Sequence, residues 1–198
     1  GEGLGDNVSE TDPQGEGLAP LAAKALSADS QKTAGAVNAF VAAAREVLAG
    51  RSTANMVLLR GFSKTPNLPN MGEAYRLMPA AVAAYPMYRG IAKLVGMEVL
   101  PTGETFDDQL NTLESRFADN DFFFVHYKPA DAAGEDGDFG AKVAALEELD
   151  KRIPRLLALG PDTLVVAGDH STPAIMGGHS WHPVPLLIPS PFTLGEGT

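Results

Sequence analysis

The chain has 198 residues, 44% of them hydrophobic, which is ordinary globular composition and enough for one sizeable core or two small domains. The formal net charge is -10 and the 15 Lys and Arg residues are scattered, which argues against a nucleic-acid partner because phosphate neutralisation needs clustered cations. Cysteine is absent, so any metal must be held by oxygen and imidazole groups.

No segment has the length and apolarity of a membrane helix. The longest apolar stretches, residues 77–85 and 164–167, fall far short of the ~20 residues that span a bilayer, and no signal segment opens the sequence. We therefore expect a cytoplasmic protein without a membrane partner. Residues 1–30 lack helical and strand periods and are expected to form an active-site loop or linker. The first residue is not Met, so we expect the chain to begin partway into a longer protein.

The first regular element is an amphipathic helix over residues 31–48. Its apolar residues recur at three- and four-residue spacing, and Gly50 is placed to end it. Residues 55–60 are expected to form a buried strand that carries Arg60 to its end, and residues 76–85 a second buried strand.

Shorter elements follow. Residues 88–95 predict a short helix and residues 97–100 a third strand. The sequence Thr-Phe-Asp-Asp at residues 105–108 is typical of a capping box, and apolar residues continue on one helical face as far as Phe117.

A βαβ unit is expected in the second half of the chain. It comprises a strand over residues 122–127, a polar loop, a long helix over residues 139–159 and a strand over residues 163–167. Pro154 is expected to kink or divide the helix. The pattern favours an α/β fold with a mostly parallel sheet.

Both strands of this unit run into residues that commonly bind metals. Asp131 and Glu135 follow the first strand, Asp169 and His170 follow the second, and His179 lies in a histidine-rich loop further on. Sites in open α/β sheets are built at the carboxyl ends of strands. Carboxylates and imidazoles in this arrangement could hold two hard divalent ions and clamp a phosphoryl group between them.

Each of these residues has a simpler explanation when it is taken alone. An Asp-His pair after a strand is often a helix cap or a surface turn, and a single His is usually a packing residue. His126, inside an apolar strand, is expected to be a core histidine. The joint arrangement of the two carboxylate loops and the histidine-rich loop is what favours a metal centre.

Several separated stretches resemble one family. Residues 166–173 read Val-Ala-Gly-Asp-His-Ser-Thr-Pro, with His-Ser at 179–180 and Pro-Val-Pro at 183–185. This resembles the C-terminal signature of cofactor-independent phosphoglycerate mutases, particularly their archaeal-type branch, within the alkaline phosphatase superfamily. Three further stretches also resemble that branch, so the resemblance covers nearly the whole chain: residues 1–13, 58–61 and 88–92.

The resemblance implies a ligand set. One divalent ion would be held by Asp131, Glu135 and His179, although Glu135 stands where the family usually has a histidine. The other would be held by Asp169 and His170, together with an aspartate and a nucleophilic serine that nothing in this chain matches. Manganese is the expected ion, with Mg²⁺, Co²⁺ and Zn²⁺ as alternatives, and no bisphosphoglycerate is needed.

The resemblance also implies an architecture. Residues 1–101 would be part of an inserted α/β phosphotransferase domain that binds substrate, and residues 102–198 the C-terminal part of a metal-binding, alkaline phosphatase-like domain. The chain would be an incomplete piece of that fold. Arg60 would bind the substrate phosphate or carboxylate, and Arg89 would stand where a lysine often assists at the transferring phosphoryl group.

The implied reaction is the glycolytic interconversion of 3-phosphoglycerate and 2-phosphoglycerate through a phosphoserine. Two alternatives remain open: another alkaline phosphatase superfamily enzyme, such as a phosphatase or phosphopentomutase, or a noncatalytic metal-binding module. The chain alone is expected to be inactive because the serine is missing. Self-association is an open expectation, since missing strands would leave sheet edges exposed.

Overall fold

The computed structural model describes residues 2–15 and 17–189. The chain forms two compact units, Gly1–Asn67 and Leu68–Thr198. Each is described by itself below. None of the described helices is long and apolar enough to cross a membrane.

The first unit is built on one helix. Helix α1 spans Gln31–Leu48, the bounds expected from the sequence, and follows a short 3-10 turn at Ala28–Ser30. It buries Ala34 and Val37 in a small apolar cluster with two residues of the N-terminal segment, Val8 and Ala23. The N-terminal segment is irregular apart from one isolated bridge, as expected.

The strand expected at residues 55–60 is wrong. This segment forms no strand, and its hydrogen bonds are made partly with a side chain. The backbone N–H of Leu59 donates to Thr11 Oγ1 at 2.7 Å, and the Leu59 carbonyl accepts from the Thr11 N–H at 3.0 Å. These two hydrogen bonds join residues 55–60 to the N-terminal segment without forming a β-ladder.

A parallel sheet forms the centre of the second unit. Its strand order is β2-β1-β3, with β1 at Pro79–Val82, β2 at Glu98–Val99 and β3 at Phe122–Val125. Both pairings are parallel, and Val82 is in register with Val125. All four β1 residues are buried, as expected for a central strand covered on both faces. The predicted α/β class with a parallel sheet is confirmed.

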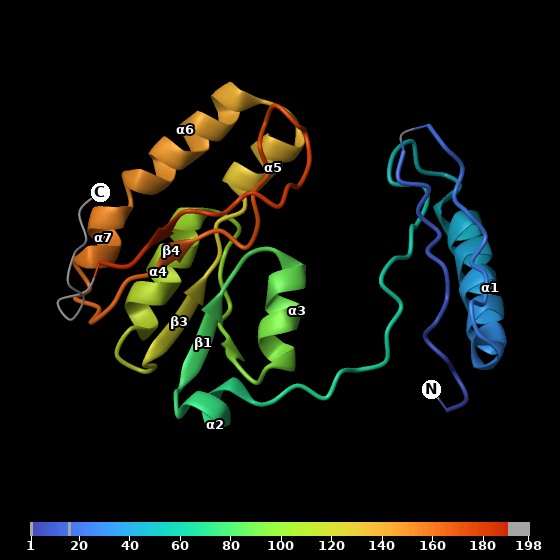
Figure 1. The fold of residues 1–198 in the computed structure, drawn as a ribbon, viewed down its shortest axis with the longest axis horizontal. Helices are drawn as coiled ribbons and strands as arrows, with labels where there is room; N and C mark the ends of the chain where they lie inside the picture. Colours follow the sequence, from blue (N-terminus) through green and yellow to red (C-terminus); the bar gives the residue numbers. More distant parts are fainter. Residues whose placement is uncertain (1, 16, 190–198) are drawn as a thin grey trace. The chain divides into compact units, whose positions relative to one another are not determined.

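Helices connect and cover these strands (Figure 1). A short α2 at Met71–Tyr75 precedes β1, α3 at Pro86–Leu94 links β1 to β2, and α4 at Phe106–Arg116 links β2 to β3. Helix α3 contacts β1 and β2, and α4 contacts β1. The capping box is confirmed, since Thr105 accepts from the Asp108 N–H and Asp108 accepts from the Thr105 N–H.

The segment after β3 differs from the expected polar loop. It forms a helix, α5, at Pro129–Glu135, with Pro129 in its first turn, a position that proline favours. The long helix is divided as expected near Pro154, into α6 at Phe139–Asp150 and α7 at Ile153–Leu157.

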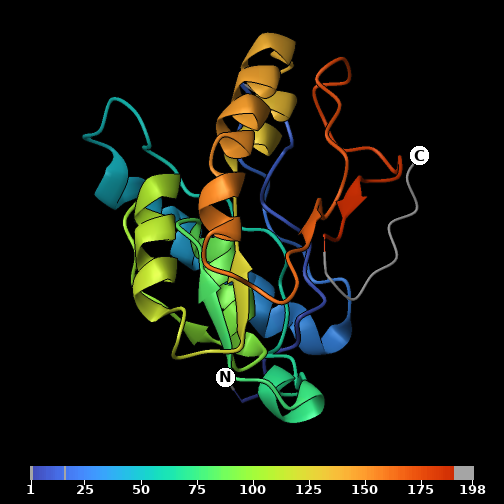
Figure 2. The same cartoon turned by 90° about the vertical axis from the view of Figure 1, so that its left-hand side faces the viewer.

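The expected βαβ crossover is wrong. Strand β4, at Val166–Ala167, is short and pairs antiparallel with β5, at Leu186–Leu187, instead of joining the parallel sheet. Figure 2 shows this pair to one side of the parallel strands. Strand β4 pairs with β5, a later segment of the chain that the predicted βαβ unit did not include.

Along the sequence, the division between the two compact units falls between Asn67 and Leu68, earlier than the domain boundary expected at residues 101–102. Strand β1 lies before that expected boundary and pairs with β3 beyond it, which joins both sides in one sheet. The assignment of residues 1–101 and 102–198 rests on the family architecture and stays a prediction.

Candidate metal centre

Three of the five predicted metal ligands lie within reach of a single ion. Ligand atoms of Asp131, His170 and His179 all lie within 4.8 Å of one another. Asp131 comes from α5, His170 follows β4, and His179 lies in the loop before β5. Residues separated by up to 48 positions therefore lie close together.

The other two predicted ligands border this cluster. The carboxylate Oε1 of Glu135 lies 3.3 Å from His179 Nε2, and Asp169 Oδ2 lies 3.7 Å from His170 Nε2. The rings of His170 and His179 lie against each other, with 3.8 Å between their centroids. All five side chains thus border one region, with Glu135 next to His179 and Asp169 next to His170.

The distribution of these ligands between two ions stays a prediction. The resemblance puts His170 with Asp169 at the second ion and Asp131 with His179 at the first. In the structure His170 lies near both aspartates, with Nδ1 3.9 Å from Asp131 Oδ1 and Nε2 3.7 Å from Asp169 Oδ2.

A folded loop carries His179 back to His170. The Ser180 N–H donates to the Ser171 carbonyl at 2.9 Å, an antiparallel bridge that closes the loop between them. Gly177 turns the chain with φ at 57°, a left-handed conformation that glycine adopts without strain. The bridge places His179 and His170 on neighbouring segments.

A lysine that the sequence analysis did not identify lies among the acidic ligands. Lys128 hydrogen-bonds to Asp131, and its Nζ lies 3.5 Å from Glu135 Oε2. The hydrogen bond to Asp131 raises the pKa of Lys128. Burial acts to raise the pKa of Asp131, but hydrogen bonds from Lys128 and Thr172 outweigh it and leave that pKa below its usual value. Asp131 is therefore held as an anion, the form that binds cations.

Tyr88 is a second residue that the sequence analysis missed. Its hydroxyl donates to Asp169 and its ring stacks on His126. The hydrogen bond to Asp169 is the main cause that raises the pKa of Tyr88 to about 12. Burial opposes ionisation of Asp169, yet the Tyr88 hydrogen bond keeps the pKa of this carboxyl below its usual value.

His126 was expected to be a core histidine, and it is partly buried. Burial lowers the pKa of its imidazole, which favours the neutral ring. The ring lies in an aromatic stack with Tyr88 and Phe124, so its described contacts are those of a packing residue.

Thr172 is the third residue near the predicted ligands that the sequence analysis did not identify. Its side chain is buried, and its hydroxyl lies between Asp131 and His170. Tyr88 and Thr172 lie within two stretches that carry the family resemblance, residues 88–92 and 166–173, but the sequence analysis gave neither of them a role. Lys128 lies outside those stretches, and its only signal was its position three residues before Asp131.

The two predicted substrate arginines have different surroundings. Arg60 belongs to the first unit, where it forms ion pairs with Glu10 at 3.6 Å and Asp12 at 3.5 Å. Arg89 lies on α3 next to Tyr88 and is exposed, and no ion pair involves it among the described residues. Their contact with substrate stays a prediction.

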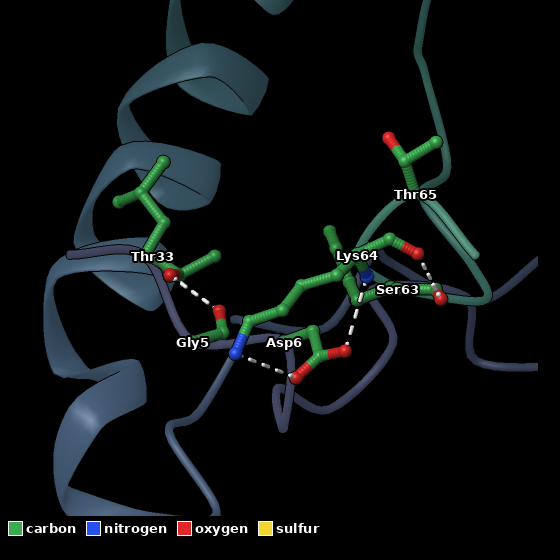
Figure 3. A pocket seen from close by; sticks show the side chains of 8 residues that line it. Gly5, Asp6, Thr33, Ser63, Lys64 and Thr65 are labelled. Atoms are coloured by element: carbon green, nitrogen blue, oxygen red, sulfur yellow. Dashed lines mark hydrogen bonds and ion pairs between the residues drawn. The ribbon is translucent and has the colours of Figure 1, made fainter. Parts of the chain in front are cut away.

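The first unit also contains a pocket of about 380 Å³ (Figure 3). Asp6 accepts from the backbone N–H of Lys64 at 3.0 Å, and its carboxylate lies 4.0 Å from the Lys64 ammonium. Thr33 donates to the Gly5 carbonyl at 2.6 Å. These groups already satisfy one another, and we assign the pocket no ligand.

The donor set at the five-residue cluster fits a divalent cation. Carboxylate oxygens and imidazole nitrogens together bind Mn²⁺, Co²⁺ and Zn²⁺, and a site without thiolate excludes ions that need sulfur. The three closest ligands project from separate backbone segments, which allows them to lie on different sides of one ion.

A family model described as "Metalloenzyme superfamily" matches residues 11–195. The chain belongs to the metalloenzyme superfamily. This membership agrees with the cluster of carboxylate and imidazole ligands, and it implies binding of a divalent metal.

Curated relatives of this chain share one specific name. The chain is 53% identical to a "probable 2,3-bisphosphoglycerate-independent phosphoglycerate mutase" of Thermotoga neapolitana, over 98% of this chain and 48% of that protein. It is 52% identical to a Thermus thermophilus protein of the same name, over 97% of this chain and 48% of that protein. The expected resemblance is confirmed, and the chain spans about half the length of the curated relatives it matches.

Two solved structures resemble the fold. A Pyrococcus horikoshii protein, PH0037, matches 66% of this chain and 43% of its own, with 31% identity and a TM-score of 0.63. A cofactor-independent phosphoglycerate mutase of Thermoplasma acidophilum matches 100% of this chain and 52% of its own, with 23% identity and a TM-score of 0.56. The second likeness concerns the fold alone.

Proposed function

We propose that the full-length protein interconverts 3-phosphoglycerate and 2-phosphoglycerate through a phosphoserine, without bisphosphoglycerate. The observation that carries this proposal is the convergence of Asp131, His170 and His179 within 4.8 Å in a chain about half identical to relatives with that name. The activity would be that of an isomerase of glycolysis and gluconeogenesis, an intramolecular phosphotransferase.

Two divalent ions, manganese in this proposal, would serve the reaction. When bound, such ions lower the pKa of a nucleophilic hydroxyl and neutralise charge on the phosphoryl oxygens. Asp131, Glu135 and His179 would hold one ion, and Asp169 and His170 the other. Mg²⁺, Co²⁺ and Zn²⁺ suit the same donors and are the alternatives.

The chain's own residues would bind and orient the substrate. Arg60 would hold the phosphate or carboxylate through its fork of N–H donors, and Arg89 would offset charge on the phosphoryl group as it passes across. Glu10 and Asp12, which pair with Arg60, support this proposal because they hold the guanidinium in place before an anion replaces them.

The ammonium of Lys128 would offset the negative charge of two acidic ligands. It is bonded to Asp131 and lies near Glu135, so it offsets the extra negative charge that Glu135 brings where the family usually has a neutral imidazole. Phosphoglycerate is the proposed partner, in the cytoplasm, and the acidic net charge supports the absence of a nucleic-acid partner.

The test is a phosphorus NMR assay of the full-length protein with 3-phosphoglycerate. We expect 2-phosphoglycerate to form without added bisphosphoglycerate, the activity to disappear after chelation, and Mn²⁺ to restore it. Release of inorganic phosphate instead would indicate a phosphatase. Metal binding without any phosphoryl transfer would indicate a noncatalytic metal-binding module. The 198-residue chain alone is expected to give no turnover, because nothing in it matches the serine.

A further inference from the structure

Thr172 is almost completely buried between two predicted metal ligands. Thr172 is 4% exposed to solvent. Its Oγ1 donates a hydrogen bond to Asp131 Oδ1 at 2.6 Å and lies 3.0 Å from His170 Nδ1. One hydroxyl therefore joins a ligand on α5 to a ligand that follows β4.

The number of hydrogens on the Thr172 hydroxyl decides which group donates in its hydrogen bonds to Asp131 and His170. A threonine hydroxyl carries one hydrogen, and an ionised carboxylate can only accept. The hydroxyl hydrogen is therefore used on Asp131, which leaves only oxygen lone pairs for His170. The bond to His170 forms when Nδ1 carries the proton, and in a neutral imidazole the bare nitrogen is then Nε2.

We propose that Thr172 is a positioning residue that selects Nε2 of His170 as the metal-binding nitrogen and holds Asp131 beside it. A histidine ligand commonly donates its second ring N–H to a neighbouring oxygen, which sets both tautomer and ring orientation. The proposal rests on the proposed metal centre but does not depend on the mutase reaction.

Two contacts hold the backbone of Thr172 in place independently of its hydroxyl. The Lys142 ammonium donates to the carbonyl oxygens of Thr172 at 2.8 Å and Ala130 at 3.1 Å, and so joins the loop to α5. A Cβ on Gly134 would lie 2.3 Å from the Thr172 carbonyl oxygen, so α5 approaches the loop this closely only because residue 134 is glycine. The hydroxyl is thus presented to both ligands by a supported backbone.

The experiment compares Thr172→Val with Thr172→Ser in the full-length protein. Valine has nearly the shape of threonine without the hydroxyl, whereas serine keeps the hydroxyl. Thr112→Val is the matched control, because the Thr112 hydroxyl donates at 3.0 Å to the Asp108 carbonyl within α4 and has no partner among the five predicted ligands.

The first readout is the tautomer of His170 in metal-free protein, by long-range ¹⁵N–¹H correlation at about pH 8, where imidazoles are neutral. We expect the Nδ1–H form in the wild type, Thr172→Ser and Thr112→Val, and a mixture or the Nε2–H form in Thr172→Val. An Nε2–H form in the wild type would overturn the proposal even if Thr172→Val failed to fold.

The second readout is Mn²⁺ affinity by calorimetry. We expect Thr172→Val to weaken binding by roughly 10- to 100-fold, the usual effect of removing a hydrogen-bond partner of a ligand, and Thr172→Ser to restore most of it. Equal affinity in the wild type and Thr172→Val would overturn the role of Thr172. No Mn²⁺ binding by the wild type would overturn the metal centre itself, and normal binding with no mutase activity would overturn only the proposed reaction.

Discussion

The ring of Tyr88 stacks on the ring of His126, with 3.7 Å between their centroids, and the Tyr88 hydroxyl hydrogen-bonds to Asp169. The stack joins α3 to the segment after β3, and the hydroxyl extends this contact to the segment after β4. One side chain therefore connects three separate parts of the second unit at the edge of the metal centre.

Tyr88→Phe is expected to keep the stack and lose the hydrogen bond. Without it the Asp169 carboxylate is less well oriented, so we expect Mn²⁺ affinity to fall about 10-fold, at the lower end of such effects. Calorimetry on the full-length protein measures this change. Tyr75→Phe is the control, since Tyr75 lies on α2 and is 70% exposed. Unchanged affinity in Tyr88→Phe would show that the hydroxyl does not orient Asp169.

Lys128→Met is expected to strengthen the binding of Mn²⁺ when no substrate is present. The Lys128 ammonium is bonded to Asp131 and lies 3.5 Å from Glu135, so it repels a cation that approaches the same oxygens. Allowing for solvent screening, removal of this charge should tighten binding about 10-fold.

The control for this variant is Lys151→Met, which removes a lysine paired with Glu148 on α6. Lys128→Arg, which keeps the charge, should behave like the wild type. Weaker binding in Lys128→Met would mean that the ammonium organises the carboxylates more than it competes with the ion.

The metal-free protein is expected to lose stability in acid partly through Asp131. Because hydrogen bonds from Lys128 and Thr172 outweigh burial and lower its folded pKa, Asp131 contributes stability at pH values above its unfolded pKa of about 3.9. This contribution is lost as the pH falls through the lower folded pKa. Urea unfolding followed by circular dichroism from about pH 6 to about pH 2 measures the loss. Asp131→Asn should show a smaller decline with pH, and an identical decline in both proteins would contradict the prediction.

Gly134→Ala is expected to destabilise the second unit by about 2 kcal/mol, in the range for overpacking. The added Cβ would lie 2.3 Å from the Thr172 carbonyl oxygen, and this contact is to backbone that cannot turn away. Thermal unfolding measures the change. Gly140→Ala is the matched control on α6, where the nearest atom is 3.5 Å away and alanine should be neutral or stabilising. Equal melting temperatures for wild type and Gly134→Ala would show that the loop can shift.

Local patterns predicted the elements whose causes are local. The bounds of α1, the capping box at Thr105 and the division of the helix near Pro154 all follow from spacing, hydrogen-bonding side chains and the missing proline N–H. The candidate ligands were also predictable as a group, because carboxylates and imidazoles after strand ends are unusual in combination.

Pairing between distant segments was not predictable in the same way. Strand β4 is two residues long, and its partner β5 follows a loop of 18 residues, so its periodicity could not indicate which strand it would join. The segment at residues 55–60 was apolar enough for a strand, but its donor at Leu59 is bonded to Thr11.

The amino-acid sequence alone determined the residue types of the candidate metal centre, the α/β class and the family resemblance, because these depend on composition and short-range order. Only the tertiary structure decided that Tyr88, Lys128 and Thr172 contact Asp169, Asp131 and His170. Such contacts depend on how helices and loops far apart in the chain pack together, and hydrogen bonds a few ångströms long leave no periodic trace in the sequence.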